Sequence, residues 1–198
     1  ISMSKNDGSI KNLETLAVRA GQERTNEMEH SDPIFATSSF VFEDSAQAAA
    51  RFSESEPGNI YSRFTNPTVR AFEKRLAAME SASYSIATSS GMSAILLLGL
   101  ALLKRGDHVV CARQVFGATI SLFTKIFSRF GINVQFVSIS DRLAWKNAIR
   151  QETRMLFLET PSNPIGEIGD INGLATLAHD RNILLVVDNA YCTPALQR

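Results

Sequence analysis

The chain has 198 residues, 44% of them hydrophobic, so it can bury a sizeable core. Its 20 Lys and Arg side chains balance 20 Asp and Glu side chains, and this zero net charge argues against a nucleic-acid-binding protein. Two cysteines, Cys111 and Cys192, favour free thiols in the cytoplasm over a disulfide framework. The longest apolar run, 94–103, is too short to cross a bilayer, so we expect no membrane segment.

The first 65 residues lack sustained periodicity. We expect a short helix over 12–20, a turn or helix over 45–52, and a polar segment rich in Glu, Ser, Pro and Gly over 53–59. Composition leaves open whether residues 1–65 form an arm on another surface or a mobile segment.

From Asn66 the pattern becomes regular. Asn66 and Pro67 predict a helix start, and the apolar residues that follow share one helix face: Val69, Phe72, Leu76 and Met79. The next helix, 91–104, is apolar nearly all round, so we expect it to be buried.

Short apolar strands and helices then alternate to the end of the chain. The expected strands are 108–112, 132–139, 154–159 and 183–188, and the expected helices are 118–130, 141–150 and 170–180. This alternation predicts that residues 66–198 form an α/β layer with a mostly parallel sheet.

Three places in this layer carry chemistry. Ser90, Gly91 and Met92 stand at the mouth of the apolar helix, where free N–H groups suit a phosphate. Taken alone, this pattern is more typical of a simple helix cap with a small residue.

The other two places follow apolar strands. Asp188 ends the strand 183–188, where a carboxylate can hold a positive charge of a ligand. Asn163 lies in the proline-rich turn 159–164, where its amide can bond a ligand oxygen. The plainer interpretations are a carboxylate that caps the next element and an ordinary rigid turn; together, the three places predict one phosphorylated ligand.

Four motifs resemble the Cys/Met-metabolism family of pyridoxal-phosphate (PLP) enzymes and follow that family's order: YSRFTNPT (61–68), SSGM (89–92), ETPSNP (159–164) and VDN (187–189). The resemblance implies the aspartate-aminotransferase-like fold (fold type I), with a mostly parallel seven-stranded sheet covered by helices on both faces. It also implies that residues 1–65 contact a neighbouring subunit, and that 66–198 are the first part of the PLP-binding domain.

The family's residue roles transfer to matching positions. Ser90, with the backbone of Gly91 and Met92, would bind the PLP phosphate, and Tyr61 and Arg63 would reach the phosphate of a neighbouring subunit.

On the ring itself, Asp188 would pair with the pyridine nitrogen and Asn163 would bond the phenolic oxygen. The ring-stacking position falls on Phe116, where many relatives carry a tyrosine. Phenylalanine can stack but cannot transfer a proton.

Within the family, QVFGATISLF (114–123) and DNAYCTPAL (188–196) resemble most the O-succinylhomoserine sulfhydrylases, which form homocysteine from a homoserine ester and sulfide. Cystathionine γ-synthase and the γ-lyases are the alternatives. The resemblance further implies a cytoplasmic homo-oligomer, a dimer of dimers, that acts on small molecules.

The family's Schiff-base lysine lies in a Ser-x-Thr-Lys segment roughly two dozen residues beyond the strand-end aspartate. This chain ends ten residues beyond Asp188, and we assign the role to none of its six lysines: Lys5, Lys11, Lys74, Lys104, Lys125 and Lys146. We therefore expect these 198 residues alone to be inactive.

The sequence gives weaker support to two further kinds of site. His30, His108 and His179 show no metal-ligand spacing, so we expect no metal site. A non-catalytic nucleotide- or phosphate-binding α/β domain is the alternative from another class, but the chain lacks the Gly-x-Gly-x-x-Gly of a dinucleotide site.

Overall fold

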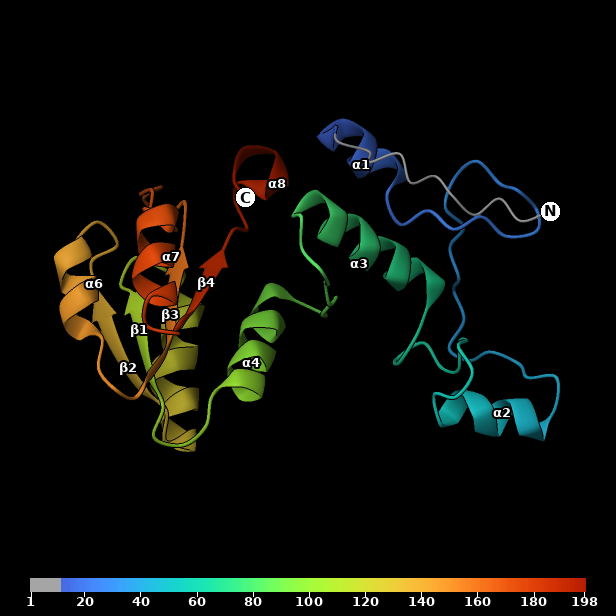
Figure 1. Ribbon diagram of the computed structural model, residues 1–198, viewed down its shortest axis with the longest axis horizontal. Coiled ribbons are helices and arrows are strands. Elements are labelled where there is room, and N and C mark those ends of the chain that lie inside the picture. Colours follow the sequence, from blue (N-terminus) through green and yellow to red (C-terminus); the bar gives the residue numbers. More distant parts are fainter. Residues whose placement is uncertain (1–11) are drawn as a thin grey trace. The chain divides into compact units, whose positions relative to one another are not determined.

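The computed structural model describes residues 12–198, which form two compact units (Figure 1). The first ends at Ala87 and the second comprises Thr88–Arg198. These units are defined by their compactness. The boundary expected after residue 65 instead separates a subunit-contacting segment from the cofactor-binding domain, and it stays a prediction. Among the described residues, no helix is long and apolar enough to cross a membrane.

The first unit contains three helices, at the expected places: α1 (Leu13–Arg19), α2 (Ser45–Phe52) and α3 (Pro67–Met79). Each begins after an Asn or Asp whose side chain accepts a backbone N–H of the first turn: Asn12, Asp44 and Asn66. Such caps satisfy donors that the helix itself leaves unpaired, and they explain why the sequence located these starts.

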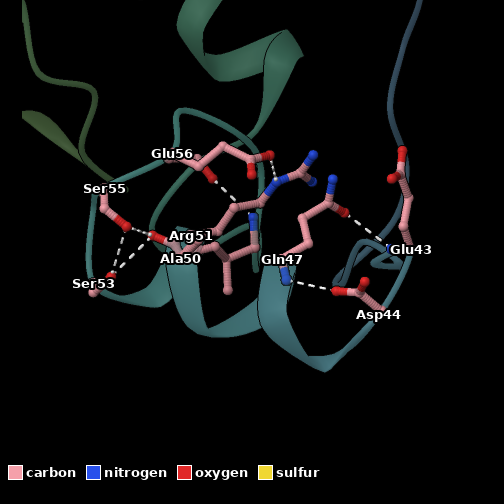
Figure 2. Close-up of polar contacts among 10 residues, drawn as sticks. Glu43, Asp44, Gln47, Ala50, Arg51, Ser53, Ser55 and Glu56 are labelled. Atoms are coloured by element: carbon pink, nitrogen blue, oxygen red, sulfur yellow. Dashed lines mark hydrogen bonds and ion pairs between the residues drawn. The ribbon is translucent and has the colours of Figure 1, made fainter.

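Polar contacts fix the two ends of α2 (Figure 2). At its start, Asp44 accepts the N–H of Gln47 at 2.7 Å, and the Gln47 side chain accepts the N–H of Glu43 at 2.9 Å. At its end, Ser53 and Ser55 both donate to the carbonyl of Ala50. Residues 53–56 therefore form a turn that is bonded to the end of α2.

The second unit contains one sheet of parallel strands in the order β2-β1-β3-β4. The strands are β1 (His108–Ala112), β2 (Asn133–Val137), β3 (Thr153–Glu159) and β4 (Leu184–Asp188). The α/β class and the parallel sheet are confirmed. The described residues supply four of the seven strands expected for a complete domain.

The helices of this unit precede, connect and follow the strands. They are α4 (Gly91–Leu102), α5 (Gly117–Ser121), the π-helix η1 (Leu122–Ile126), the 3-10 helix η2 (Phe127–Phe130), α6 (Arg142–Ala148), α7 (Ile171–His179) and α8 (Thr193–Leu196). The single helix expected over 118–130 is thus continuous in space but changes its winding twice. It ends, as expected, at Gly131, which has a φ of 75°.

The direction of the connections places helices on both faces of the sheet. The chain moves one way from β1 to β2 and the other way from β2 to β3 and β4. Because such crossovers are right-handed, the segment α5–η2 covers one face and α6 and α7 cover the other (Figure 1). The side chains agree, since Phe157 meets Phe123 of η1 and the next residue, Leu158, meets Gly169 before α7.

The expectation that α4 is buried is wrong for the described residues. Only Gly99 is buried in this helix, whereas Leu97, Leu100 and Leu102 are about half exposed. A Cβ at Gly99 would lie 2.1 Å from the Phe127 ring, so α4 packs closely on η2 along one side. An apolar helix is buried only where neighbours cover it, and here they cover one side.

Candidate active site

A cavity of about 340 Å³ lies at the carboxyl ends of the strands in the second unit. Ligands of open α/β sheets bind where the strand order reverses, which here is between β1 and β3. The volume falls within the range of small-molecule sites. The lining comes from the start of α4, the α5 region and the ends of β3 and β4: Ser90, Gly91, Met92, Ile95, Phe116, Thr119, Glu159, Asn163, Asp188, Ala190 and Tyr191.

The N-terminus of α4 presents free backbone donors to this cavity. The Ser90 hydroxyl caps the helix by accepting the N–H of Ser93 at 3.1 Å. The N–H groups of Gly91 and Met92 have no partner among residues 12–198. A Cβ at Gly91 would meet nothing within 4 Å, so the approach to these donors is open. The Ser90 side chain is thus a helix cap. The backbone N–H groups of Gly91 and Met92 remain available for an anion.

Asp188 and Asn163 line the cavity, and both have side-chain atoms that are free to bond a ligand. Asp188 ends β4, and one of its oxygens accepts the N–H of Ala190 at 3.1 Å. Its carboxylate has no cationic partner within the described part of the chain. The Asn163 amide likewise makes no hydrogen bond to any residue from 12 to 198. These groups can therefore bind a cationic group and an oxygen of a ligand.

Phe116 supplies an aromatic face to the same cavity. It precedes α5, lies 47% exposed, and its backbone N–H donates to Oε2 of Glu159 at 2.6 Å. The cavity thus combines a phosphate-compatible helix start, a flat apolar surface and two polar strand ends. The structure brings together six of the expected residues: Ser90, Gly91, Met92, Phe116, Asn163 and Asp188.

The sequence interpretation missed Glu159 as a site residue. Its side chain is only 3% exposed, and its position in β3 pairs with that of Asp188 in β4. Burial, and then the nearby Asp188 carboxylate, raise the pKa of Glu159, while the backbone N–H groups of Phe116 and Asn163 oppose this. The available signal was its place as the last residue of an apolar strand, next to an expected ligand-binding turn.

Thr119 was also missed. It is 1% exposed, lines the cavity, and its hydroxyl lies 3.8 Å from the sulfur of Met92. Nothing in its local sequence distinguishes it from an ordinary helix residue, because its role depends on the packing of α5 against α4.

Tyr61 and Arg63 belong to the first unit, where they lie side by side. The guanidinium carbon of Arg63 lies 5.1 Å from the Tyr61 ring centre and 5.4 Å from that of Phe64. Within the described residues, no carboxylate pairs with Arg63. Its charge is therefore available to an anion, and its reach into a neighbouring subunit stays a prediction.

The lysines among residues 12–198 give no candidate for covalent attachment. Of those described, none lines the cavity: Lys74, Lys104, Lys125 and Lys146. Lys5 and Lys11 lie outside the described residues. The described residues also contain no group of three or more His, Cys, Asp or Glu side chains that could hold a metal ion.

The fold and the cavity define the large domain of a fold-type-I PLP enzyme. The family model described as "Cys/Met metabolism PLP-dependent enzyme" matches residues 14–198. The chain belongs to this family, whose cofactor is PLP.

Named relatives fall in several branches of the family. The chain is 57% identical over 186 residues to an O-succinylhomoserine sulfhydrylase of Pseudomonas aeruginosa, covering 94% of this chain and 46% of that protein. It is 41% identical over 187 residues to an L-methionine gamma-lyase of Fusobacterium nucleatum, covering 94% and 47%. The chain thus spans about half the length of the curated relatives it matches.

Solved structures agree with this assignment. A putative O-acetylhomoserine (thiol)-lyase of Campylobacter jejuni, which carries a pyridoxyl-lysine phosphate, superposes with a TM-score of 0.86 at 35% identity, over 93% of this chain and 45% of that one. A cystathionine gamma-lyase of Lactobacillus plantarum gives a TM-score of 0.82 at 31% identity, over 92% and 46%.

Proposed function

We propose that the cavity binds PLP through residues of this chain. The N–H groups of Gly91 and Met92, with the capped start of α4, would bind the phosphate. Phe116 would stack on the ring, Asn163 would bond the phenolic oxygen, and Asp188 would pair with the ring nitrogen. The support is the fit: the two N–H groups and the Asn163 amide lack protein partners among residues 12–198, and all face one cavity.

PLP, when bound, supplies an electron sink for carbanions next to an amino-acid nitrogen. Asp188 maintains that capacity because its negative charge keeps the ring nitrogen protonated. Phe116 excludes water from one ring face but has no group that moves a proton. Proton transfer must therefore rely on another residue of the complete enzyme.

For the complete enzyme we propose a γ-replacement that forms a carbon–sulfur bond. O-succinylhomoserine and hydrosulfide would give homocysteine and succinate: the Cγ–O bond breaks, the ester oxygen leaves with succinate, and sulfur bonds to Cγ. The observation that carries this choice is the 57% identity to the P. aeruginosa sulfhydrylase, against 41% for the methionine lyase.

A γ-elimination is the second candidate, because methionine and cystathionine lyases are also among the relatives. It would release a keto acid and ammonia instead of homocysteine. Cystathionine γ-synthase, which uses cysteine as the thiol, is the alternative within γ-replacement.

The test is a product assay on the complete holoenzyme. O-succinylhomoserine is supplied with sulfide, with cysteine or with no thiol, and methionine is supplied alone. We expect homocysteine with sulfide to dominate. Dominant keto-acid release from methionine would support the lyase, and cystathionine would support the synthase. The non-catalytic alternative predicts no product in any arm.

We also propose that Tyr61 and Arg63 bind the phosphate at the site of a partner subunit, which requires at least a dimer. We further propose that the complete enzyme is a dimer of dimers in the cytoplasm. Subunit complementation tests this cross-subunit role. Arg63→Ala and Asp188→Asn variants, each weakly active, are unfolded, mixed and refolded together. If Arg63 acts across subunits, mixed dimers contain one site with both native residues, and activity recovers. If it acts within its own chain, no site is complete and activity stays low.

A further inference from the structure

Glu159 is a buried carboxylate placed among three of the residues proposed to hold the cofactor. It is the last residue of β3 and only 3% exposed, yet no Lys, Arg or His pairs with it in the described part of the chain. A buried charge without a cationic partner is costly unless hydrogen bonds compensate it. Its contacts must therefore explain its presence.

The compensating donor is a backbone group of one of the cofactor residues. The N–H of Phe116 donates to Oε2 of Glu159 at 2.6 Å. Asn163 and Glu159 line the same cavity. Through β-sheet register, Glu159 is the direct neighbour of Asp188. The Glu159 side chain thus links the end of β3 to the segment before α5, and it lies beside the end of β4.

We infer that Glu159 is a positioning residue: its carboxylate holds Phe116 in the place from which the Phe116 ring orients the cofactor ring on Asp188. This inference rests on the proposed PLP site. It assigns Glu159 no contact with substrate or cofactor.

The chemistry of the side chain explains why a glutamate suits this place. An ionised carboxylate only accepts hydrogen bonds, and its charge strengthens the bond from the Phe116 N–H. Glutamine has the same shape but no charge, so its bond to this N–H would be weaker. Aspartate keeps the charge but is one methylene shorter, so it would not reach the Phe116 N–H without a backbone shift.

The test uses the complete PLP-loaded protein and measures the cofactor, not turnover. Free PLP is achiral, so the visible circular dichroism per bound PLP reports how the protein orients the ring. For Glu159→Gln we expect a changed ratio of visible circular dichroism to absorbance, and an increase of about tenfold in the PLP dissociation constant. The matched control is Glu152→Gln, an exposed glutamate immediately before the start of the same strand.

The outcomes separate positioning from stability. A Glu159→Gln protein with wild-type ratio and affinity would overturn the inference. If this variant does not fold, Glu159→Asp decides: we expect it to fold with a changed ratio, and a wild-type ratio would overturn the inference. Failure of both to fold would make Glu159 purely structural and overturn it as well. The measurement needs no thiol or homoserine ester, so it does not depend on which reaction the enzyme performs. If the wild-type protein bound no PLP, that result would count against the proposed function instead.

Discussion

The two units are stabilised in different ways. The second has a continuous core, in which Phe123 lies edge-on to the rings of both Phe127 and Phe157 at 5.2 Å. In the first, only one apolar side chain among residues 12–87 is buried, that of Ala77. Polar contacts replace the core there: Arg75 binds the Ala20 carbonyl and Asp32, and the Asn66 amide donates to the Phe35 carbonyl. A site that needs fixed geometry is accordingly built on the second unit.

The largest expected effect tests this difference directly. Phe123→Ala removes a side chain that is 1% exposed, so the free energy of unfolding should fall by about 3–5 kcal/mol. The matched change in the first unit, Phe72→Ala, alters a ring that is 55% exposed and should cost less than about 1 kcal/mol. Urea denaturation of both variants measures this. Equal losses would show that the first unit also depends on an apolar core.

Next in size is the loss of the strand-end charge. Asp188→Asn keeps the shape but removes the charge that holds the ring nitrogen protonated. Turnover of the complete enzyme should fall by at least about 100-fold, or about 2.7 kcal/mol of barrier. Steady-state kinetics measures this, with the exposed Asp180→Asn as control. A near-wild-type rate for Asp188→Asn would remove Asp188 from the site.

Sequence and structure agree best where local chemistry decides the outcome. The capping side chains Asn66, Asp141 and Asp170 marked helix starts, because each accepts an N–H only two or three residues away. Asp188 at the end of β4 and Asn163 in the turn after β3 were also found, since the position of a residue at or after the end of an apolar strand is visible in the sequence.

What the sequence did not reveal depends on distant partners. The bond from Phe116 to Glu159 spans 43 residues, and its existence depends on strand order. The exposure of α4 depends on which elements cover it. The π and 3-10 turns between Leu122 and Phe130 likewise reflect packing, since nothing in LFTKIFSRF interrupts a helical pattern.

A smaller effect is expected from the polar contacts of Arg75 in the first unit. Arg75→Gln removes the ion pair with Asp32 (2.5 Å) and weakens the bond to the Ala20 carbonyl (2.8 Å). We expect the loop between α1 and α2 to loosen, at a cost of about 1–3 kcal/mol. Limited proteolysis measures it, because cleavage between residues 20 and 35 should become faster. The exposed Arg129→Gln, outside this segment, serves as control, and equal rates for the two variants would refute the role of Arg75.

The smallest effect, counted per pH unit, is a pH dependence in the second unit. His108 is 1% exposed and its Nδ1 lies 2.8 Å from the Thr153 hydroxyl. Burial, and then the positive charge of Arg150, lower the pKa of His108 from 6.5 to about 4. Between these values the unfolded chain binds the proton and the native state does not, so stability falls as the pH drops from 6.5 to about 4.

The expected slope from this one group is at most about 1.4 kcal/mol per pH unit. Urea denaturation between pH 4 and 7 measures it. The slope should diminish in His108→Gln and persist in His179→Gln, whose side chain is exposed. An unchanged slope in His108→Gln would assign the effect to other groups.

The central claim is that the cavity at the ends of β1, β3 and β4 holds PLP. A crystal structure of the complete PLP-loaded enzyme tests it most directly. We expect the phosphate on the N–H groups of Gly91 and Met92, the ring against Phe116, and the ring nitrogen within hydrogen-bond distance of Asp188. A phosphate bound elsewhere, or a ring nitrogen that faces away from Asp188, would contradict the account.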